Sequence, residues 1–147
     1  MIKSNPDHHD AEIALKLYEL RREDLMRKSR DIILGQFWPK NYDEFMAITD
    51  IKHPMNAAFR QVTSYWEMAY GFAKNGVVNP DFLIECNGGE GLLMFAKFKP
   101  YIEQFRREVA PTALQNTEWI TQNSAVAKKR LELMESRVAK MLQTMKG

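Results

Sequence analysis

A group of aromatic and charged side chains between residues 65 and 106 is the part of this sequence best suited to hold a ligand. The members of the group are Tyr65, Trp66, Glu67, Tyr70 and Arg106. Indole and phenol groups on a mostly apolar helix need hydrogen-bond partners if they are buried. Glu67 either faces solvent or pairs with Arg106 or Arg107 on an antiparallel neighbouring helix. The group therefore predicts either a core aromatic cluster with a flanking ion pair or a ligand pocket lined by the rings.

The three histidines do not form a recognisable metal site. Di-iron centres in helical bundles need Glu-x-x-His motifs on two helices, and the nearest approach here is Asp50-x-x-His53. We expect His53 to be a surface or capping residue. His8 and His9 have acidic neighbours, but we expect them to lie in a solvated N-terminal tail. A lone cysteine provides no zinc-ligand spacing, so we predict no metal and no other cofactor.

Neither nucleophilic catalysis nor phosphate binding finds a suitable motif. Cys86 has no histidine near it in the sequence, so we interpret it as a half-buried structural thiol. The segment Gly88-Gly89-Glu90-Gly91 opens a predicted helix, where anions can bind. It lacks the lysine and the preceding strand of a P-loop, and Glu90 would itself occupy the position that favours negative charge. We therefore predict no catalytic residue.

The elements that carry these residues are predicted to be helices. Apolar side chains recur with steps of three and four residues in two series, Met55–Phe59–Val62–Trp66–Ala69–Ala73 and Leu92–Phe95–Phe98–Ile102–Phe105–Val109. This spacing is typical of two antiparallel helices that bury their faces together. No segment alternates apolar and polar residues, so we predict an all-α fold. The expected architecture is an antiparallel bundle of about four main helices with short connecting helices.

Glycine and proline mark the predicted joints between the central helices. Asn75-Gly76 can signal a β-hairpin, but its flanks have helical period, so we predict a left-handed helix C-cap at Gly76. Asn79 and Pro80 then begin a short helix that ends near Cys86. Pro100 is predicted to kink or split the second long helix.

The N-terminal part is predicted to be helical after a flexible tail formed by residues 1–9. Either Asp7 or Asp10 is a suitable N-cap for the first helix. Apolar residues continue at helical spacing to residue 37. The charged stretch near Glu23 leaves open whether residues 10–37 form one helix or two.

Two short helices are predicted on either side of the central pair. The first covers residues 41–49, with Asn41 as its cap and Phe45 and Ile48 as its buried residues. The second covers residues 114–122 and follows the helix end at Pro111.

A long amphipathic helix is predicted over residues 124–147. Its heptad-like seam consists of Leu131, Met134, Val138, Met141 and Met145, preceded by Ala127. Such a seam can pack on its own bundle, pair with another copy of the chain, or lie on an anionic membrane. The opposite face is basic. We expect a membrane surface to be the least favoured of the three partners.

Composition and charge limit the number of domains, the partners and the cellular location that we expect. The chain has 147 residues, the size of a single domain, and a net charge of only +2, whereas nucleic-acid-binding domains usually have a much stronger basic bias. We therefore expect no nucleic-acid partner. We predict a cytoplasmic protein from three features. The chain has a single cysteine, no apolar run long enough to span a bilayer, and a polar N-terminus.

The central stretch resembles a group of small, mostly bacterial helical proteins known only as a domain of unknown function. The motifs that carry the resemblance are YWEMAYGF, KNGVVNPDFL, FAKFKPYIEQFRR and PTALQNTEW, within residues 40–120. Many of those relatives have an N-terminal membrane helix, from which this chain departs. The resemblance implies a helical fold and no particular chemistry.

From these observations we predict a non-catalytic helical interaction or scaffold domain that acts as a homo-oligomer. The partner is another copy of the chain or an unidentified protein. The alternative is a small-molecule-binding domain with an aromatic-lined pocket between the central helices.

Overall fold

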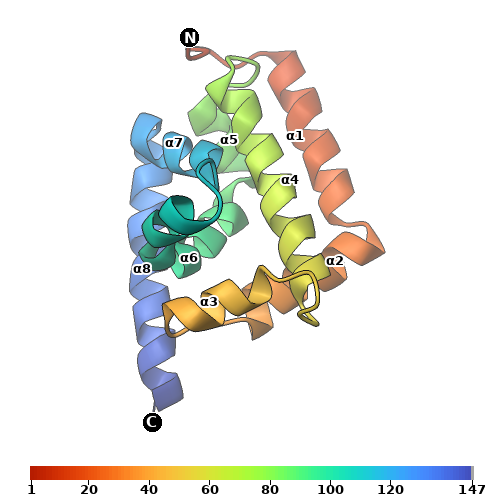
Figure 1. Ribbon diagram of the computed structural model, residues 1–147. Coiled ribbons are helices and arrows are strands. Elements are labelled where there is room, and N and C mark those ends of the chain that lie inside the picture. Colours follow the sequence, from red (N-terminus) through yellow and green to blue (C-terminus); the bar gives the residue numbers. More distant parts are fainter. Residues whose placement is uncertain (147) are drawn as a thin grey trace.

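The computed structural model describes residues 1–146 and confirms the all-α prediction (Figure 1). Over these residues the chain forms eight α-helices, one π-helix and no β-strand. The elements are α1 (His8–Arg21), α2 (Asp24–Arg30), η1 (Asp31–Gln36), α3 (Tyr42–Ile48), α4 (Asn56–Lys74), α5 (Pro80–Asn87), α6 (Gly89–Glu108), α7 (Gln115–Asn123) and α8 (Ala125–Lys146). No helix of this part of the chain is long and apolar enough to cross a membrane.

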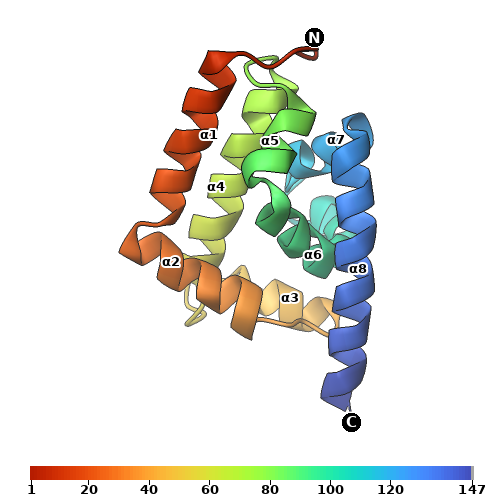
Figure 2. The same cartoon turned by 180° about the vertical axis from the view of Figure 1, so that it is seen from behind.

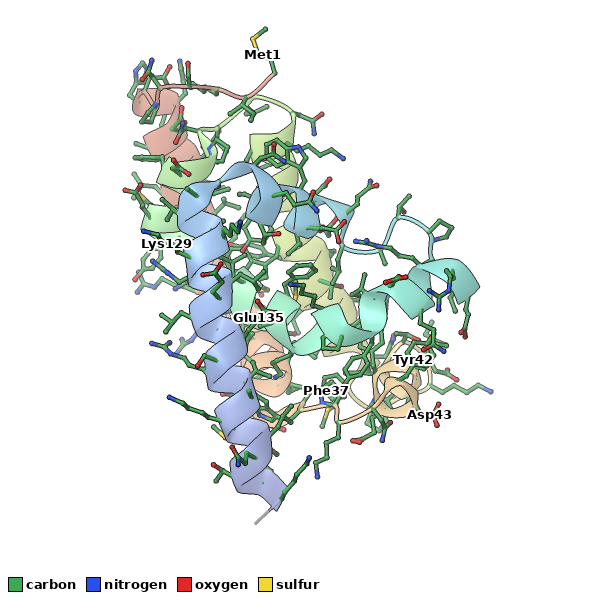
Figure 3. All side chains as sticks on the ribbon, turned by 90° about the vertical axis from the view of Figure 1, so that its left-hand side faces the viewer. Met1, Phe37, Tyr42, Asp43, Lys129 and Glu135 are labelled. Carbon is green, nitrogen blue, oxygen red and sulfur yellow. The ribbon has the colours of Figure 1, made fainter. Side chains whose placement is uncertain are left out.

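The long helices enclose a core that α2 and α3 close at one end. In Figures 1 and 2, α1 and α8 lie on opposite sides of the molecule and α4 runs between them. Helix α6 packs against α8, which it crosses in Figure 3, and α7 packs against both α4 and α8. The C-terminal turns of α8 project beyond α3. The largest fully buried side chains include Trp66, Tyr70, Phe45, Phe95 and Phe98.

The N-terminal region forms two α-helices rather than one. Helix α1 begins after Asp7, which forms a capping box with Asp10, so the segment predicted as a tail overlaps α1 at His8 and His9. The helix ends at Arg21. Glu23 then caps α2 by accepting a hydrogen bond from the backbone N–H of Leu25. A break between two helices at this charged stretch was one of the two predicted alternatives.

Helix α2 continues directly into the π-helix η1, a change of helix type that the apolar spacing did not reveal. The backbone N–H of Phe37 bonds to the carbonyl of Ile32, five residues earlier. The chain then leaves the helix toward Pro39, which has no N–H to donate. The carbonyl groups of the last turn of η1 therefore need donors from elsewhere.

The joints around α5 follow the predicted turn chemistry. Gly76 has φ +77°, the left-handed conformation predicted for it. The side chain of Asn79 accepts a hydrogen bond from the N–H of Phe82, and Pro80 occupies the first turn of α5. Helix α6 continues through Pro100 without being split. Local sequence thus determines where these helices begin and end.

Candidate functional site

The predicted aromatic cluster is packed into the core. Trp66 and Tyr70 are fully buried, and the hydroxyl group of Tyr70 donates to the carbonyl of Gly88 at 2.6 Å. The Tyr65 hydroxyl donates to the carbonyl of Leu17 at 2.5 Å. Burial raises the pKa of Tyr65 to about 12. Two of the three polar ring groups thus have partners inside the fold.

The indole nitrogen of Trp66 is the exception. It is buried and has no hydrogen-bond partner among the described residues. The ring stacks on Tyr70 with centroids 5.5 Å apart, and Gly91 of α6 lies directly against both rings. A Cβ atom at Gly91 would be 2.8 Å from Cδ2 of Trp66. A ligand role for these rings stays a prediction, and the free space lies elsewhere.

Glu67 pairs with neither of the arginines that we considered. Its carboxylate accepts hydrogen bonds from the N–H of Asn116 at 3.1 Å and the N–H of Thr117 at 2.8 Å. The hydroxyl of Thr117 donates to the same carboxylate at 2.6 Å. These groups form the first turn of α7, whose own N-cap residue, Leu114, provides no side-chain cap. Glu67 of α4 therefore caps α7 from another helix, where its charge also suits the helix dipole.

Arg106 has a different carboxylate partner. Its Nη1 atom lies 3.1 Å and 3.2 Å from the two carboxylate oxygens of Glu118, and its Nε donates to the carbonyl of Ala113 at 2.8 Å. Arg107 instead pairs with Glu103 within α6. Arg106 thus ties the end of α6 to the loop before α7 and does not approach Glu67 through an ion pair.

A groove between α3, α4, α6 and the α6–α7 connection is the main apolar hollow near the predicted site. Its volume is about 530 Å³. We call it the phenylalanine groove, and it is lined by Phe45, Phe59, Arg60, Thr63, Ser64, Glu67, Ile102, Phe105, Thr112, Ala113 and Leu114. Of the five predicted binding residues, only Glu67 lines it. The groove lies beside a different set of rings from those that the sequence suggested, so the predicted ligand pocket stays a prediction.

The wall of the phenylalanine groove contains an unusual backbone conformation. Leu114 has φ 53° and ψ 28°, the sole positive φ of a non-glycine residue in the described part of the chain. A bulky residue rarely adopts this left-handed conformation, which costs of order 1 kcal/mol or more. The strain is sustained where Leu114 is buried and Glu67 holds the following helix. Sequence spacing gave no signal for it.

Lys97 is a buried charged residue that the sequence did not indicate. Its side chain is only 3% exposed, and Nζ donates to the carbonyls of Ile33 at 2.5 Å and Leu34 at 3.4 Å. The same atom lies 4.1 Å from the ring centroid of Trp38. Burial lowers the pKa of Lys97 to about 7. The side chain supplies the donors that the last turn of η1 lacks.

Comparison with known protein families shows one match. Residues 6–124 match the family described as a domain of unknown function, DUF4760. The chain belongs to this family. The resemblance inferred from the central motifs is thus confirmed, and the match extends through α1 to α7. No curated protein and no solved structure matches the chain.

Helix α8 follows the region matched to DUF4760, and its predicted seam divides into two parts. Ala127, Leu131 and Val138 are buried against the fold. Met141 and Met145 are each 45% exposed. The first half of the seam therefore packs on the chain's own core. In the last turns Leu142 still packs against the core, while Met141 and Met145 are partly exposed.

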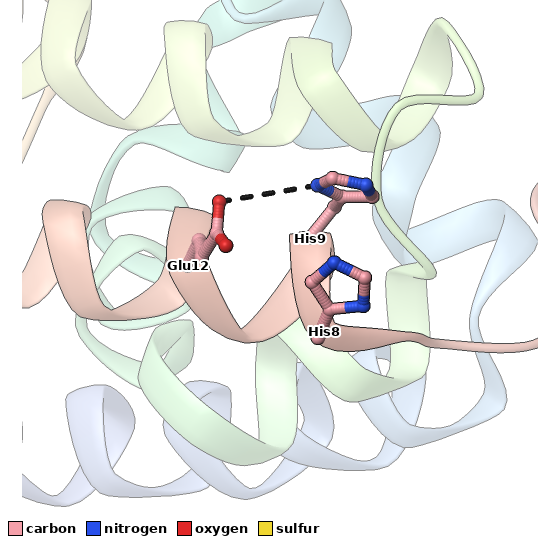
Figure 4. A group of neighbouring side chains, drawn as sticks. All are labelled: His8, His9 and Glu12. Atoms are coloured by element: carbon pink, nitrogen blue, oxygen red, sulfur yellow. Dashed lines mark ion pairs between the residues drawn. The ribbon is translucent and has the colours of Figure 1, made fainter.

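The remaining candidates of this DUF4760 member lie apart from the phenylalanine groove. Cys86 is exposed rather than half-buried, and Nδ1 of His53 accepts a hydrogen bond from the N–H of Met55, a capping role. Figure 4 shows His8, His9 and Glu12 on α1, with their ligand atoms within 4.8 Å of one another. All three are exposed at a helix N-terminus, where the helix dipole disfavours a cation.

Proposed function

We propose that this chain is a non-catalytic binding domain that holds a small, mainly apolar molecule in the phenylalanine groove. The observation that carries the proposal is the groove itself, about 530 Å³ in volume and lined by Phe45, Phe59 and Phe105. Ligand pockets typically measure about 300–1,000 Å³ and combine apolar walls with a few polar groups. The hydroxyl and charged groups of α4 supply the polar part.

Two further features support this site over the tightly packed Trp66 cluster. The strained backbone of Leu114 lies in the groove wall, and strained residues concentrate at binding sites. The capping contact between Glu67 and Thr117 fixes the same wall to α7. A wall held in place before binding reduces the entropy lost when a ligand binds.

The test is a titration with N-phenyl-1-naphthylamine, a neutral apolar probe whose fluorescence rises in apolar surroundings. We expect saturable binding to the full chain and at least about a tenfold loss of affinity for Thr63→Trp, which fills the groove from its rim. Met68→Trp places the same ring on the exposed side of α4, outside the groove, and serves as the matched control. Unsaturable binding, or equal binding by Thr63→Trp, would contradict the proposal.

The second candidate function is self-association through the end of α8, as expected from the seam. The exposure of Met141 and Met145 beyond the last buried residue, Val138, favours it. We expect a dimer by light scattering at micromolar concentration, lost in Met141→Glu and kept in Gln143→Glu on another face of the same turns. A full-length monomer at that concentration would eliminate this candidate. A cytoplasmic location also stays a prediction.

A further inference from the structure

Two charged side chains line the phenylalanine groove, Glu67 and Arg60, and the oxygens of Glu67 are already engaged. Glu67 uses both carboxylate oxygens to accept hydrogen bonds from Asn116 and Thr117. It also lies at the positive end of α7. Arg60 forms no ion pair with any carboxylate of residues 1–146. The uncompensated charge at the groove is therefore positive.

The guanidinium group of Arg60 is held in place by a buried side chain. Its Nε donates to Oδ1 of Asn56 at 2.9 Å. Asn56 is 2% exposed, and its Nδ2 donates in turn to the carbonyl of Ile48 at 2.8 Å. This chain of bonds fixes one edge of the guanidinium and leaves both Nη groups available to a ligand. An arginine positioned in this way binds carboxylate-like groups with two parallel hydrogen bonds.

The two hydroxyl groups of α4 that line the groove are already engaged, so Arg60 is the polar side chain of α4 that still has donors available there. Oγ1 of Thr63 donates to the carbonyl of Phe59 at 2.7 Å, and Oγ of Ser64 donates to the carbonyl of Arg60 at 2.6 Å. Both hydroxyl protons are thus engaged within α4. A cationic head group would have to compete with α7 for the oxygens of Glu67, whereas an anionic one meets a free donor.

We propose that the ligand is a single-chain acidic amphiphile, with its apolar body among the phenylalanine rings and its anionic group on Arg60. This inference rests on the proposed function and adds the chemical class of the ligand. The apolar part supplies affinity through burial, and the charge-assisted hydrogen bonds to Arg60 select the head group.

The test compares three ligands of equal chain length, namely decanoate, decanol and decylamine, as competitors of N-phenyl-1-naphthylamine. We expect decanoate to bind about tenfold more tightly than decanol, consistent with one charge-assisted pair. Arg60→Gln should remove this preference and leave decanol binding unchanged, and Arg60→Lys should keep part of it. Arg107→Gln changes an exposed arginine outside the groove and is the matched control.

The outcomes separate the inference from the proposed function. Equal binding of decanoate and decanol, stronger binding of decylamine, or failure of all three to compete would overturn the acidic class. In each of these cases saturable probe binding would leave the groove itself in place. If the unaltered chain does not bind the probe saturably, the proposed function itself is wrong. If the chain sediments with phosphatidylglycerol vesicles while decanoate fails to displace the probe, the acidic group belongs to a lipid surface. That outcome would overturn the proposal of a free ligand.

Discussion

The ammonium group of Lys97 lies 2.5 Å from the carbonyl oxygen of Ile33, so a side chain of α6 caps the last turn of η1. Glu67 does the same for the first turn of α7. Neither helix has a local side-chain cap at that end: Phe37 after η1 donates its N–H only to the carbonyl of Ile32, and α7 is preceded by a leucine. In both cases a buried or half-buried charge on a long central helix positions a short one. These two contacts hold the elements around the core in register.

The pH dependence of stability should reveal Lys97. Burial lowers its pKa to about 7 in the folded chain, whereas an unfolded lysine titrates near 10.5. Between these values the unfolded chain binds more protons, so the free energy of unfolding rises with pH. We expect an increase of up to about 3 kcal/mol from pH 7 to 9.5, measured by urea denaturation. A neutral amine still donates, so the η1 cap persists.

Two variants on α6 separate this effect from the titration of other groups. Lys97→Met should lose the rise between pH 7 and 9.5, and Lys99→Met, at an exposed position of the same helix, should keep it. A pH-independent wild type, or the same rise in Lys97→Met, would show that the ammonium group is not desolvated as described.

Removing the Glu67 carboxylate should destabilise the chain by about 1–3 kcal/mol in Glu67→Ala. The loss leaves the N–H groups of Asn116 and Thr117 without their acceptor. Chemical denaturation measures the change, and hydrogen exchange should locate it in α7. Glu103→Ala removes an exposed carboxylate of α6 and should cost less than about 0.5 kcal/mol. Equal effects of the two variants would argue against capping from another helix.

Local chemistry explains which parts of this fold the sequence predicted. Gly76, Asn79 and Asn41 act on residues within four positions of themselves, and spacing of the apolar residues marks the long helices. The partners of Glu67 and Lys97 lie about fifty and sixty-four residues away along the chain. No local rule links such positions, because the relative placement of helices decides them.

The sequence did not indicate the phenylalanine groove for a related reason. The pattern of α4 identifies Trp66 and Tyr70 as large side chains, but not whether a partner fills the space beside them. Gly91 of α6 lets the helix approach these rings closely. The phenylalanine groove is lined in part by Leu114, whose left-handed backbone could not be inferred from its residue type.

Gly91→Ala should be strongly destabilising. The added methyl group would overlap the ring of Tyr70 and lie 2.8 Å from Cδ2 of Trp66, and overpacking of a core typically costs about 1–3 kcal/mol. Gly89→Ala is the matched control in the same turn. A Cβ there meets only Nη1 of Arg130, the mobile end of a side chain. Thermal denaturation should separate the two, and equal melting temperatures would contradict the packing described here.

The ion pair between Arg30 and Glu90 should couple α2 to α6. Nε of Arg30 lies 2.7 Å from Oε2 of Glu90, a second contact joins Nη2 to Oε1, and the side chains are only 20% and 27% exposed. The adjacent carboxylate raises the pKa of Arg30. A double-mutant cycle of Arg30→Met and Glu90→Gln should give a coupling free energy of about 1–2 kcal/mol. The exposed pair of Arg107 and Glu103 should give a coupling free energy of no more than about 0.5 kcal/mol. Similar coupling free energies for the two pairs would show that Arg30 and Glu90 contribute no more than a surface ion pair.

Two truncations of α8 should separate its structural part from its exposed end. Ending the chain after Ser124 removes Ala127, Leu131 and Val138, which are at most 7% exposed. Because each buried Leu or Val contributes about 1.5–3 kcal/mol, we expect this variant to lose its cooperative unfolding transition. Ending the chain after Ala139 keeps these three buried residues. It removes Leu142, which is only partly buried against the core, so the free energy of unfolding should fall by no more than about 1–2 kcal/mol. If α8 mediates self-association, light scattering should find the chain that ends at Ala139 folded and monomeric. A folded dimer of that truncation would move the contact away from Met141 and Met145, and an unfolded one would show that the last turns stabilise the fold despite their exposure.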